Sequence, residues 1–277
     1  MKNEKIRVQK VMEIRYAVPA DAKAIVSLTE AGFRKELLNA TVYGCNGVTG
    51  FLERQISIPL EIADTVYIIA ESDDVVVGFV EFRIYSDSVF LNYIGTSPQA
   101  RHKGLATKLL GQALLMVRTS HHKIMSLDVF RDNIVAKSWY EKLGFTAEYN
   151  AGWYKLAQEE IDDSNNLHGR VSGYSQSNLC YDEFGFSQFN ITTAKGSYSV
   201  GMLGQEWFRV TQSELLFDAA ALFCLNSIDF NRSILGLFKE TEQAKLPSGA
   251  VCFCHSIRMN IQLDMFEKNI FIKKGLL

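Results

Sequence analysis

The sequence predicts a mixed α/β domain followed by a smaller α+β domain. The chain has 277 residues, which is long for a single domain. Its first half alternates strand-like apolar runs with amphipathic helical patterns. Residues 158–170 then form a polar, acidic stretch that is typical of a linker. We therefore expect domains at residues 12–157 and 171–277.

The composition is that of an ordinary globular protein. Hydrophobic residues make up 47% and charged residues 22%, and 29 Lys and Arg against 31 Asp and Glu give a formal net charge of −2. No basic run is present, which disfavours a nucleic-acid partner. The apolar stretches are too short for a membrane helix, and the N-terminus is polar. We expect a cytoplasmic protein without a signal peptide or a membrane contact.

The five cysteines indicate neither a disulfide framework nor a metal site. Cys252 and Cys254, together with His255, resemble half of a zinc site, but no matching half is found. The alternation over residues 250–263 predicts a strand, in which free cysteines pack as small apolar side chains. We therefore expect no metal.

The first domain is predicted to begin with strands and two helices. One helix starts near Pro19 and Asp21, and another spans residues 48–56. Turn signals rich in Ser and Asp separate the later strands, a pattern typical of an antiparallel meander. The predicted strands are residues 12–16, 66–70, 75–84 and 89–96.

After the meander, the pattern changes to helices that connect strands. A long helix is predicted over residues 104–119, and a strand over residues 123–130. A shorter helix over residues 133–143 ends at Gly144, a common C-terminal cap. One or two strands over residues 146–156 close the domain.

The second domain is predicted to be rich in strands. A helix over residues 214–225 follows Ser213, which we expect to be its N-cap. The order of elements is compatible with a degenerate copy of the first domain, although no phosphate loop or nucleophile motif occurs in it. The predicted strands are residues 184–192, 198–210, 234–239 and 250–263.

One segment of the first domain has the character of an anion site. A strand ends before a basic loop, and small residues open the helix that follows. Free amide N–H groups and the helix dipole at such a start attract phosphates. The P-loop and dinucleotide fingerprints are both absent. The basic and small residues are Arg101, His102, Lys103, Gly104 and Ala106.

The pattern Arg101-x-x-Gly104-x-Ala106 resembles the Arg/Gln-x-x-Gly-x-Gly/Ala signature of the GNAT acetyltransferase superfamily. Residues 127–145 resemble the next characteristic block of the family, in which Asn133 and Tyr140 share one helix face. The resemblance covers residues 12–156. It implies a mixed-sheet GNAT-type acyltransferase fold for this half of the chain.

The resemblance also implies acetyl-coenzyme A (acetyl-CoA) as the cofactor. The end of the strand before the loop would pair with the pantetheine arm, and the loop would bind the pyrophosphate. Asn133 would contact the cofactor or, alternatively, only cap its helix. The implied cofactor-binding residues are Ile94, Gly95, Thr96, Arg101, His102, Lys103, Gly104, Leu105, Ala106, Thr107, Asn133 and Tyr140.

The implied reaction is N-acetylation by direct attack of a primary amine on the thioester. Tyr140 matches the residue that often protonates the departing thiolate, although it could instead only pack beneath the coenzyme. A Tyr with an ordinary pKa of about 10 is protonated at neutral pH and can donate. The strand over residues 89–96 contains no carboxylate. Glu81 and Asp128 are the candidate bases, but Glu81 could instead pair across strands, and Asp128 could only order the sheet.

The acceptor is not identified by the sequence. In the family it is usually selected between the first two helices, here around residues 43–46. We expect a small-molecule amine, with the second domain completing the pocket, forming a lid or supplying a homodimer contact. The alternative is a non-catalytic CoA-binding sensor or scaffold, favoured by the missing carboxylate. His121 and His122 are expected to be solvated turn residues.

Overall fold

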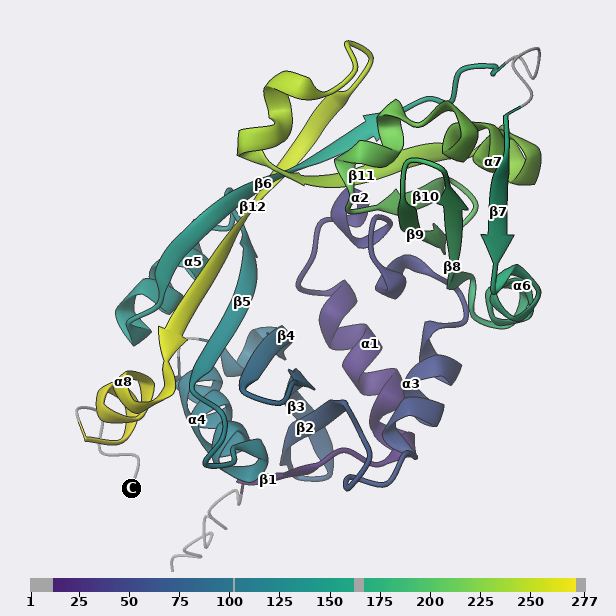
Figure 1. Cartoon of the computed structure of the whole chain (residues 1–277). Helices are drawn as coiled ribbons and strands as arrows, with labels where there is room; N and C mark the ends of the chain where they lie inside the picture. The colour runs from purple at the N-terminus through teal and green to yellow at the C-terminus, as the bar shows by residue number, and fades with distance from the viewer. Residues whose placement is uncertain (1–11, 102, 162–166, 273–277) are drawn as a thin grey trace, which may run out of the picture. The chain divides into compact units, whose positions relative to one another are not determined.

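The computed structural model describes residues 12–101, 103–161 and 167–272 (Figure 1). The contacts divide the chain into two compact units. The first unit comprises residues 1–32, 52–125 and 263–277, and the second comprises residues 33–51 and 126–262. Both units are therefore built from segments that lie far apart in the sequence.

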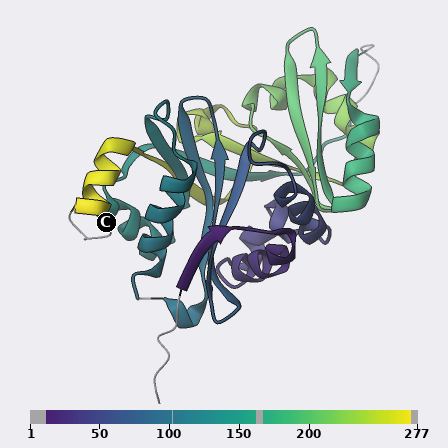
Figure 2. The same ribbon diagram turned by 90° about the horizontal axis from the view of Figure 1, so that it is seen from below.

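The first unit is built on an antiparallel sheet with the order β1-β2-β3-β4. Residues 78–82 of β3 are all buried, so both faces of the sheet are covered. Figure 2 shows α1 (Ala22–Glu30) and α4 (Leu105–Val117) on opposite sides of the sheet. The strands are β1 (Met12–Tyr16), β2 (Thr65–Ser72), β3 (Val75–Ile84) and β4 (Ser88–Thr96).

The predicted meander is confirmed, including its first turn. Asp73 and Asp74 join β2 to β3, with φ angles of 53° and 61°. Two consecutive residues with positive φ form the tight turn that matches the twist of a hairpin. The first helix also begins as predicted, because a 3-10 turn at Pro19–Asp21 leads directly into α1.

The end of the chain returns to the first unit. The last strand leads into α8 (Leu263–Glu267) and a π-helical turn (Lys268–Ile272). Arg118, at the C-terminal end of α4, pairs with Asp264 at 3.1 Å and also with Glu267. These ion pairs hold α8 against the helix that follows the basic loop.

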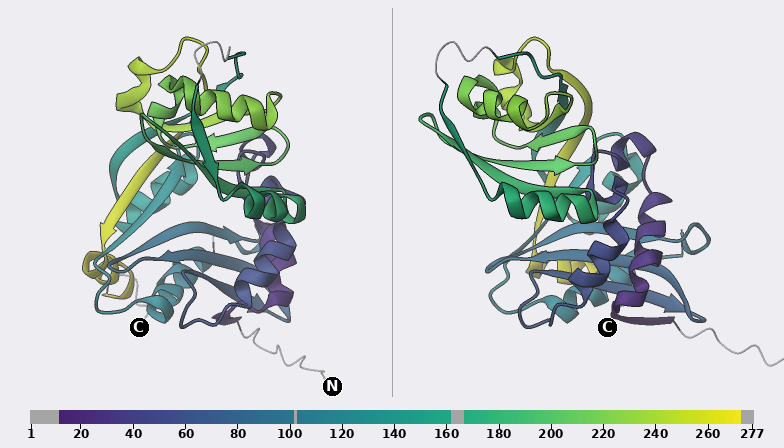
Figure 3. Two further views of the ribbon diagram at one scale, coloured as in Figure 1. Left: turned by 45° about the vertical axis from the view of Figure 1, so that its right-hand side comes forward. Right: turned by 90° about the vertical axis from the view of Figure 1, so that its right-hand side faces the viewer.

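The second unit contains strands in the order β5-β12-β6-β11-β10-β9-β8-β7. β6 is central and pairs antiparallel with β12 and β11 (Figure 3). β10 and β11 run parallel, with α7 (Ala219–Asp229) between them in the chain. The strands are β5 (Ile124–Phe130), β6 (Thr146–Leu156), β7 (Gly169–Ser172), β8 (Phe186–Thr193), β9 (Ser197–Leu203), β10 (Trp207–Val210), β11 (Ser233–Lys239) and β12 (Val251–Gln262).

Two helices of the second unit differ from the sequence prediction. The helix predicted over residues 214–225 is a 3-10 segment, Ser213–Phe217, followed by α7. Asp218 is its N-cap, because its carboxylate accepts hydrogen bonds from the amides of Ala220 and Ala221. Residues 174–184 form a helix, α6 (Tyr174–Phe184), that the prediction missed.

Residues 33–51 belong to the second unit, together with residues 126–262. This segment holds α2 (Lys35–Leu38), a 3-10 turn (Val42–Gly44) and the start of α3 (Val48–Ile56). Phe51 makes edge-to-face contacts with Phe184 at 5.5 Å and with Phe186 at 4.8 Å between ring centroids. A Cβ on Gly47 would lie 2.4 Å from Cα of Phe184, so only glycine permits this approach.

The predicted linker is partly described. Residues 162–166 lie outside the described residues, and the last two residues of the linker open β7 at Gly169. Gln158 donates hydrogen bonds to the carbonyls of Asp229 at 2.7 Å and Arg232 at 2.8 Å. The first residue of the linker is therefore hydrogen-bonded to the second unit. The domain boundaries at residues 157 and 171 stay a prediction.

Candidate functional site

The end of β4 is irregular where the cofactor was expected to pair with it. Glu81 of β3 lies opposite Tyr93, whereas the next residue, Phe82, lies opposite Leu91. Asn92 is therefore the extra residue of a β-bulge, which bends the strand locally. Regular pairing resumes beyond it, at Ile94, Gly95 and Thr96.

Gly95 is required by close packing. A Cβ at this position would lie 2.7 Å from Cε1 of the Phe79 ring. The aromatic ring of β3 therefore covers the backbone of β4, and any larger residue would displace it.

The basic loop leads into α4 through a glycine with left-handed backbone. A 3-10 turn, Pro98–Ala100, precedes Arg101, and the side chains of Arg101 and Lys103 are exposed. Gly104 is the N-cap of α4 with φ +77°, and no heavy atom lies within 4 Å of the place where a Cβ would stand. His102, also expected here, lies outside the described residues.

The first turn of α4 begins with backbone amides that lie before the first hydrogen bond of the helix. The first helical hydrogen bond runs from the amide of Lys108 to the carbonyl of Gly104, at 3.1 Å. The amides of Leu105 and Ala106 precede it and have no place in the helical ladder. Leu105 anchors the turn through a buried side chain. The geometry has the features of a phosphate site at a helix start.

Asn133 caps the predicted short helix. Its Oδ1 atom accepts a hydrogen bond from the amide of Ala136 at 3.1 Å, and α5 (Ile134–Leu143) follows. The helix ends at Gly144, which has φ +101° as a C-cap glycine should. The capping role of Asn133 is thus confirmed, and its cofactor role stays a prediction.

Tyr140 lies on α5 and is only 6% exposed. Its ring contacts Trp139 at 4.8 Å and Phe145 at 5.6 Å between centroids. Burial in this aromatic surrounding raises the pKa of the Tyr140 hydroxyl above its usual value. The hydroxyl is therefore protonated at neutral pH and can act only as a donor of its proton.

Glu81 is buried and lies next to the bulge. Its carboxylate accepts a hydrogen bond from Nδ2 of Asn92, the bulged residue itself. Tyr67 lies opposite Glu81 on the other neighbouring strand, and burial, followed by the charge of Glu81, raises the pKa of Tyr67. The carboxylate that β4 lacks is thus supplied by the adjacent strand. The sequence signal for this buried carboxylate is that Glu81 is the charged residue within the apolar run of β3.

Asp128 is occupied by an ion pair. Its two carboxylate oxygens accept hydrogen bonds from Nε and a terminal nitrogen of Arg258, at 2.6 Å and 2.9 Å. The pair raises the pKa of Arg258, chiefly through the hydrogen bond from the guanidinium to Asp128. This bidentate contact supports the alternative in which Asp128 orders the sheet.

The prediction for His122 was wrong. Its side chain is buried, and Nδ1 accepts a hydrogen bond from the amide of Thr119 at 3.2 Å. Nε2 lies 3.1 Å from the carbonyl of Tyr85. The ring therefore cross-links two turns of the first unit, whereas its neighbour His121 is exposed as expected.

All five cysteines are free thiols. Among the described residues, no three His, Cys, Asp or Glu side chains are grouped so that they could hold a metal ion. Within the same residues, no helix is both long enough and apolar enough to span a bilayer.

The first unit thus combines an antiparallel meander with a basic loop and a helix that opens at a glycine. Residues 42–145 match the model of the acetyltransferase (GNAT) family. A 5-NmdU N-acetyltransferase of Pseudomonas phage PaMx11 is 29% identical over 80 residues. That match covers 28% of this chain and 55% of the relative, so about half of the relative is represented.

Solved structures extend the likeness of fold to most of the chain. A protein of Pyrococcus horikoshii assigned as an acetyltransferase is 15% identical with a TM-score of 0.60, covering 95% of this chain and 92% of that one. A tandem GNAT protein from the clavulanic acid biosynthesis pathway is 13% identical with a TM-score of 0.56, covering 91% and 98%. The C-terminal half therefore takes part in the same mixed α/β architecture, as the strand and helix order predicted.

Proposed function

We propose that this protein is an acetyl-CoA-dependent N-acetyltransferase that acts on a primary amine of a small molecule. The observation that carries the proposal is the left-handed Gly104, which opens α4 directly after two exposed basic side chains within the family domain. The N-acetyltransferase of the phage supports nitrogen as the acceptor atom.

The loop residues fit a pyrophosphate. The Cβ of any residue other than glycine would occupy the open space beside Gly104. The amides of the first turn lie at the positive end of the α4 dipole, which attracts phosphate groups. Arg101 and Lys103 would add opposite charge. Residues 94–96, beyond the bulge, would offer backbone groups to the extended arm of the coenzyme, as in strand addition to a sheet.

Two proton-transfer roles complete the proposal. Acetyl-CoA, when bound, supplies a thioester whose carbonyl carbon the amine attacks. Tyr140 would donate its proton to the departing thiolate, and its raised pKa keeps the hydroxyl protonated at neutral pH. Glu81 would accept the ammonium proton, directly or through water, from its position beside the bulge.

Binding of coenzyme A to the full chain tests the site. Gly104→Ala places an L residue at φ +77°, so we expect the dissociation constant from titration calorimetry to rise about tenfold. Gly249→Ala is the matched control, because Gly249 is exposed, lacks a positive φ and has open space around it. Equal affinity of the two variants would contradict the assignment of the loop.

Turnover separates the proposed enzyme from its alternative. Acetyl-CoA is incubated with the protein and a panel of small primary amines, and free CoA is quantified by chromatography. Release that depends on an amine supports the acetyltransferase. Tight binding of CoA without release on any amine would favour the CoA-binding sensor, which the absence of a carboxylate on β4 also favours.

A further inference from the structure

A second cluster of chemically competent side chains lies on β12, in the second unit. The strand carries a bulge: Cys252 is opposite Tyr154 and Cys254 is opposite Trp153, which leaves Phe253 as the extra residue. In a regular strand, side chains three residues apart face opposite sides. The bulge instead brings Cys252 and His255 to the face on which Tyr154 lies.

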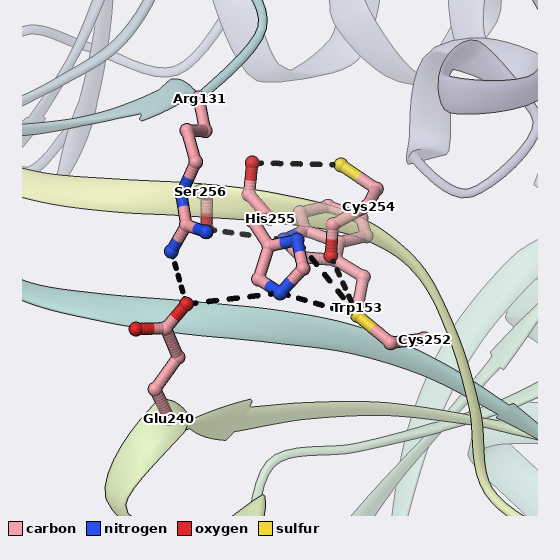
Figure 4. A network of polar contacts seen from close by, with 7 residues as sticks. All are labelled: Arg131, Trp153, Glu240, Cys252, Cys254, His255 and Ser256. Atoms are coloured by element: carbon pink, nitrogen blue, oxygen red, sulfur yellow. Dashed lines mark hydrogen bonds and ion pairs between the residues drawn. The ribbon is translucent and has the colours of Figure 1, made fainter.

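The thiol, the imidazole and a carboxylate form a continuous polar row (Figure 4). Sγ of Cys252 lies 3.6 Å from Nε2 and 4.0 Å from Nδ1 of His255. Nε2 of His255 lies 3.7 Å from Oε1 of Glu240, and Arg131 pairs with the same carboxylate. The side chains of His255 and Glu240 are 32% and 30% exposed, so solvent and small molecules can reach the row.

The carboxylate of the row is held in its charged form. Burial opposes ionisation of Glu240, but hydrogen bonds from Arg131 and Asn150 and the nearby His255 lower its pKa overall. The carboxylate lies on one side of the His255 ring and the thiol of Cys252 on the other. An imidazole this close to a thiol can take up its proton as the sulfur reacts.

Tyr154 adds an independent observation. Its hydroxyl is buried and, among the described residues, has no hydrogen-bond partner. Burial and then Cys252, the residue opposite it, raise the pKa of Tyr154, so the hydroxyl keeps its proton. Such a donor beside Cys252 would stabilise a sulfur anion. In the neutral state the thiol instead donates to the carbonyl of Cys254 at 3.3 Å.

The other four cysteines lack these features. Cys45, Cys224 and Cys254 are buried, and burial raises the pKa of each thiol. Cys180 is half-buried like Cys252, but its thiol donates to the carbonyl of Phe186. Burial and the charge of Glu183 raise its pKa. Cys180 is therefore a matched reference for a partly accessible thiol without an imidazole.

We propose that Cys252 is a reactive thiol that exchanges with low-molecular-weight disulfides. The sulfur of Cys252 attacks one sulfur of the disulfide R–S–S–R, whose S–S bond breaks as the new Cys252–S–S–R bond forms. The other half leaves as a thiolate and takes the proton that His255 received from Cys252. The small disulfide is reduced to one thiol, and Cys252 is oxidised to the mixed disulfide. This site does not depend on the proposed acetyl transfer.

The test uses the folded full-length chain and the aromatic disulfide 5,5′-dithiobis(2-nitrobenzoate). Release of the coloured thiolate follows the reaction, and peptide mass spectrometry locates the adduct. We expect Cys252 to release one equivalent of the coloured thiolate at least about tenfold faster than Cys180, because the imidazole of His255 lies 3.6 Å from its sulfur and can take up the proton. Cys252→Ser removes the fast phase and Cys180→Ser retains it. A fast adduct at Cys180, or none at Cys252, would overturn the proposal.

The role of His255 is tested by the pH dependence of the fast phase. The groups that face the thiol are His255, Glu240, Arg131 and Tyr154. His255→Gln should slow the reaction about fivefold near neutral pH, because Gln cannot take up the proton of the thiol, and the difference should shrink at alkaline pH, where a thiol ionises without a base. His121→Gln, at an exposed site, should leave the profile in place. Identical profiles for His255→Gln and the unmodified chain would refute the role of the imidazole.

Discussion

The bulge on β4 in the first unit and the bulge on β12 in the second unit perform the same geometric task in different surroundings. Each inserts one extra residue and brings two polar side chains together: Asn92 to Glu81, and Cys252 to His255. The first pair is largely enclosed, with Glu81 only 4% exposed, whereas the second remains half-exposed. The same irregularity therefore positions a shielded carboxylate in one unit and an accessible thiol in the other.

The difference shows that burial, rather than the bulge, decides the chemistry. An enclosed carboxylate is suited to accept a proton from a bound substrate. A thiol beside an imidazole at the surface is suited to react with whatever diffuses to it. The predictions below test the two regions in order of expected effect.

The largest effect is expected at Tyr140. Because Tyr140 is only 6% exposed, we expect water to be a poor substitute for its hydroxyl as a proton donor. Tyr140→Phe should lower kcat about 10³-fold and leave the affinity for coenzyme A within a factor of about two. Calorimetry and chromatographic release of CoA measure the two quantities. Unchanged turnover would leave Tyr140 as a packing residue only.

Glu81→Gln tests the buried carboxylate beside the bulge on β4. Gln still accepts the hydrogen bond from Asn92 but cannot take up a proton, so the fold should persist while kcat falls about 100-fold. The expected loss is smaller than at Tyr140, because water can partly replace a base. Glu71→Gln, the same change on β2 in the ion pair with Arg15, is the control. A loss of kcat no larger than that of the control would argue for a structural carboxylate.

Asp218 provides the reference for a buried carboxylate with a structural role. It accepts hydrogen bonds from Tyr198 at 2.9 Å and from Thr193. Burial opposes its ionisation, but these bonds and the amides that it caps lower the pKa of Asp218 overall. Asp218→Asn keeps the cap and loses the charge, so the free energy of unfolding at neutral pH should fall by about 2 kcal/mol.

The pH dependence of this effect has a definite sign. Because the pKa of Asp218 is lower in the folded chain, its stabilisation is present above the ordinary Asp pKa, about 4, and is lost as pH falls through the folded value. Denaturant titrations of the Asn variant and the unmodified chain should therefore converge in acid. Asp182→Asn, at an exposed site, should show neither the loss nor the convergence.

The smallest effect is expected at Tyr154. Removal of a buried hydroxyl without a hydrogen-bond partner should raise the free energy of unfolding of Tyr154→Phe by about 1 kcal/mol. Tyr198→Phe is the matched control and should lose stability, because its hydroxyl is bonded to Asp218. A loss of stability in Tyr154→Phe similar to that of the control would show that its hydroxyl has a strong partner in the folded chain.

Much of the fold was predictable because local signals are strong where a single residue governs the backbone. The turn at Asp73 and Asp74, the start of α4 at Gly104 and the end of α5 at Gly144 all require positive φ. The helix α6 was missed because it buries only Ser177 and Phe184 and exposes Leu179, so its sequence carries almost no amphipathic pattern.

The order of strands and helices in the first domain and the residues of its basic loop can be read from the amino-acid sequence. Folding in three dimensions was needed to show that residues 33–51 join the second unit, that Glu81 reaches the bulged Asn92, and that Glu240 lies beside His255. Each of these depends on contacts between residues distant in the chain or on one extra residue in a strand. The apolar periodicity of a segment shows which of its faces is buried, but it does not show which other segment covers that face.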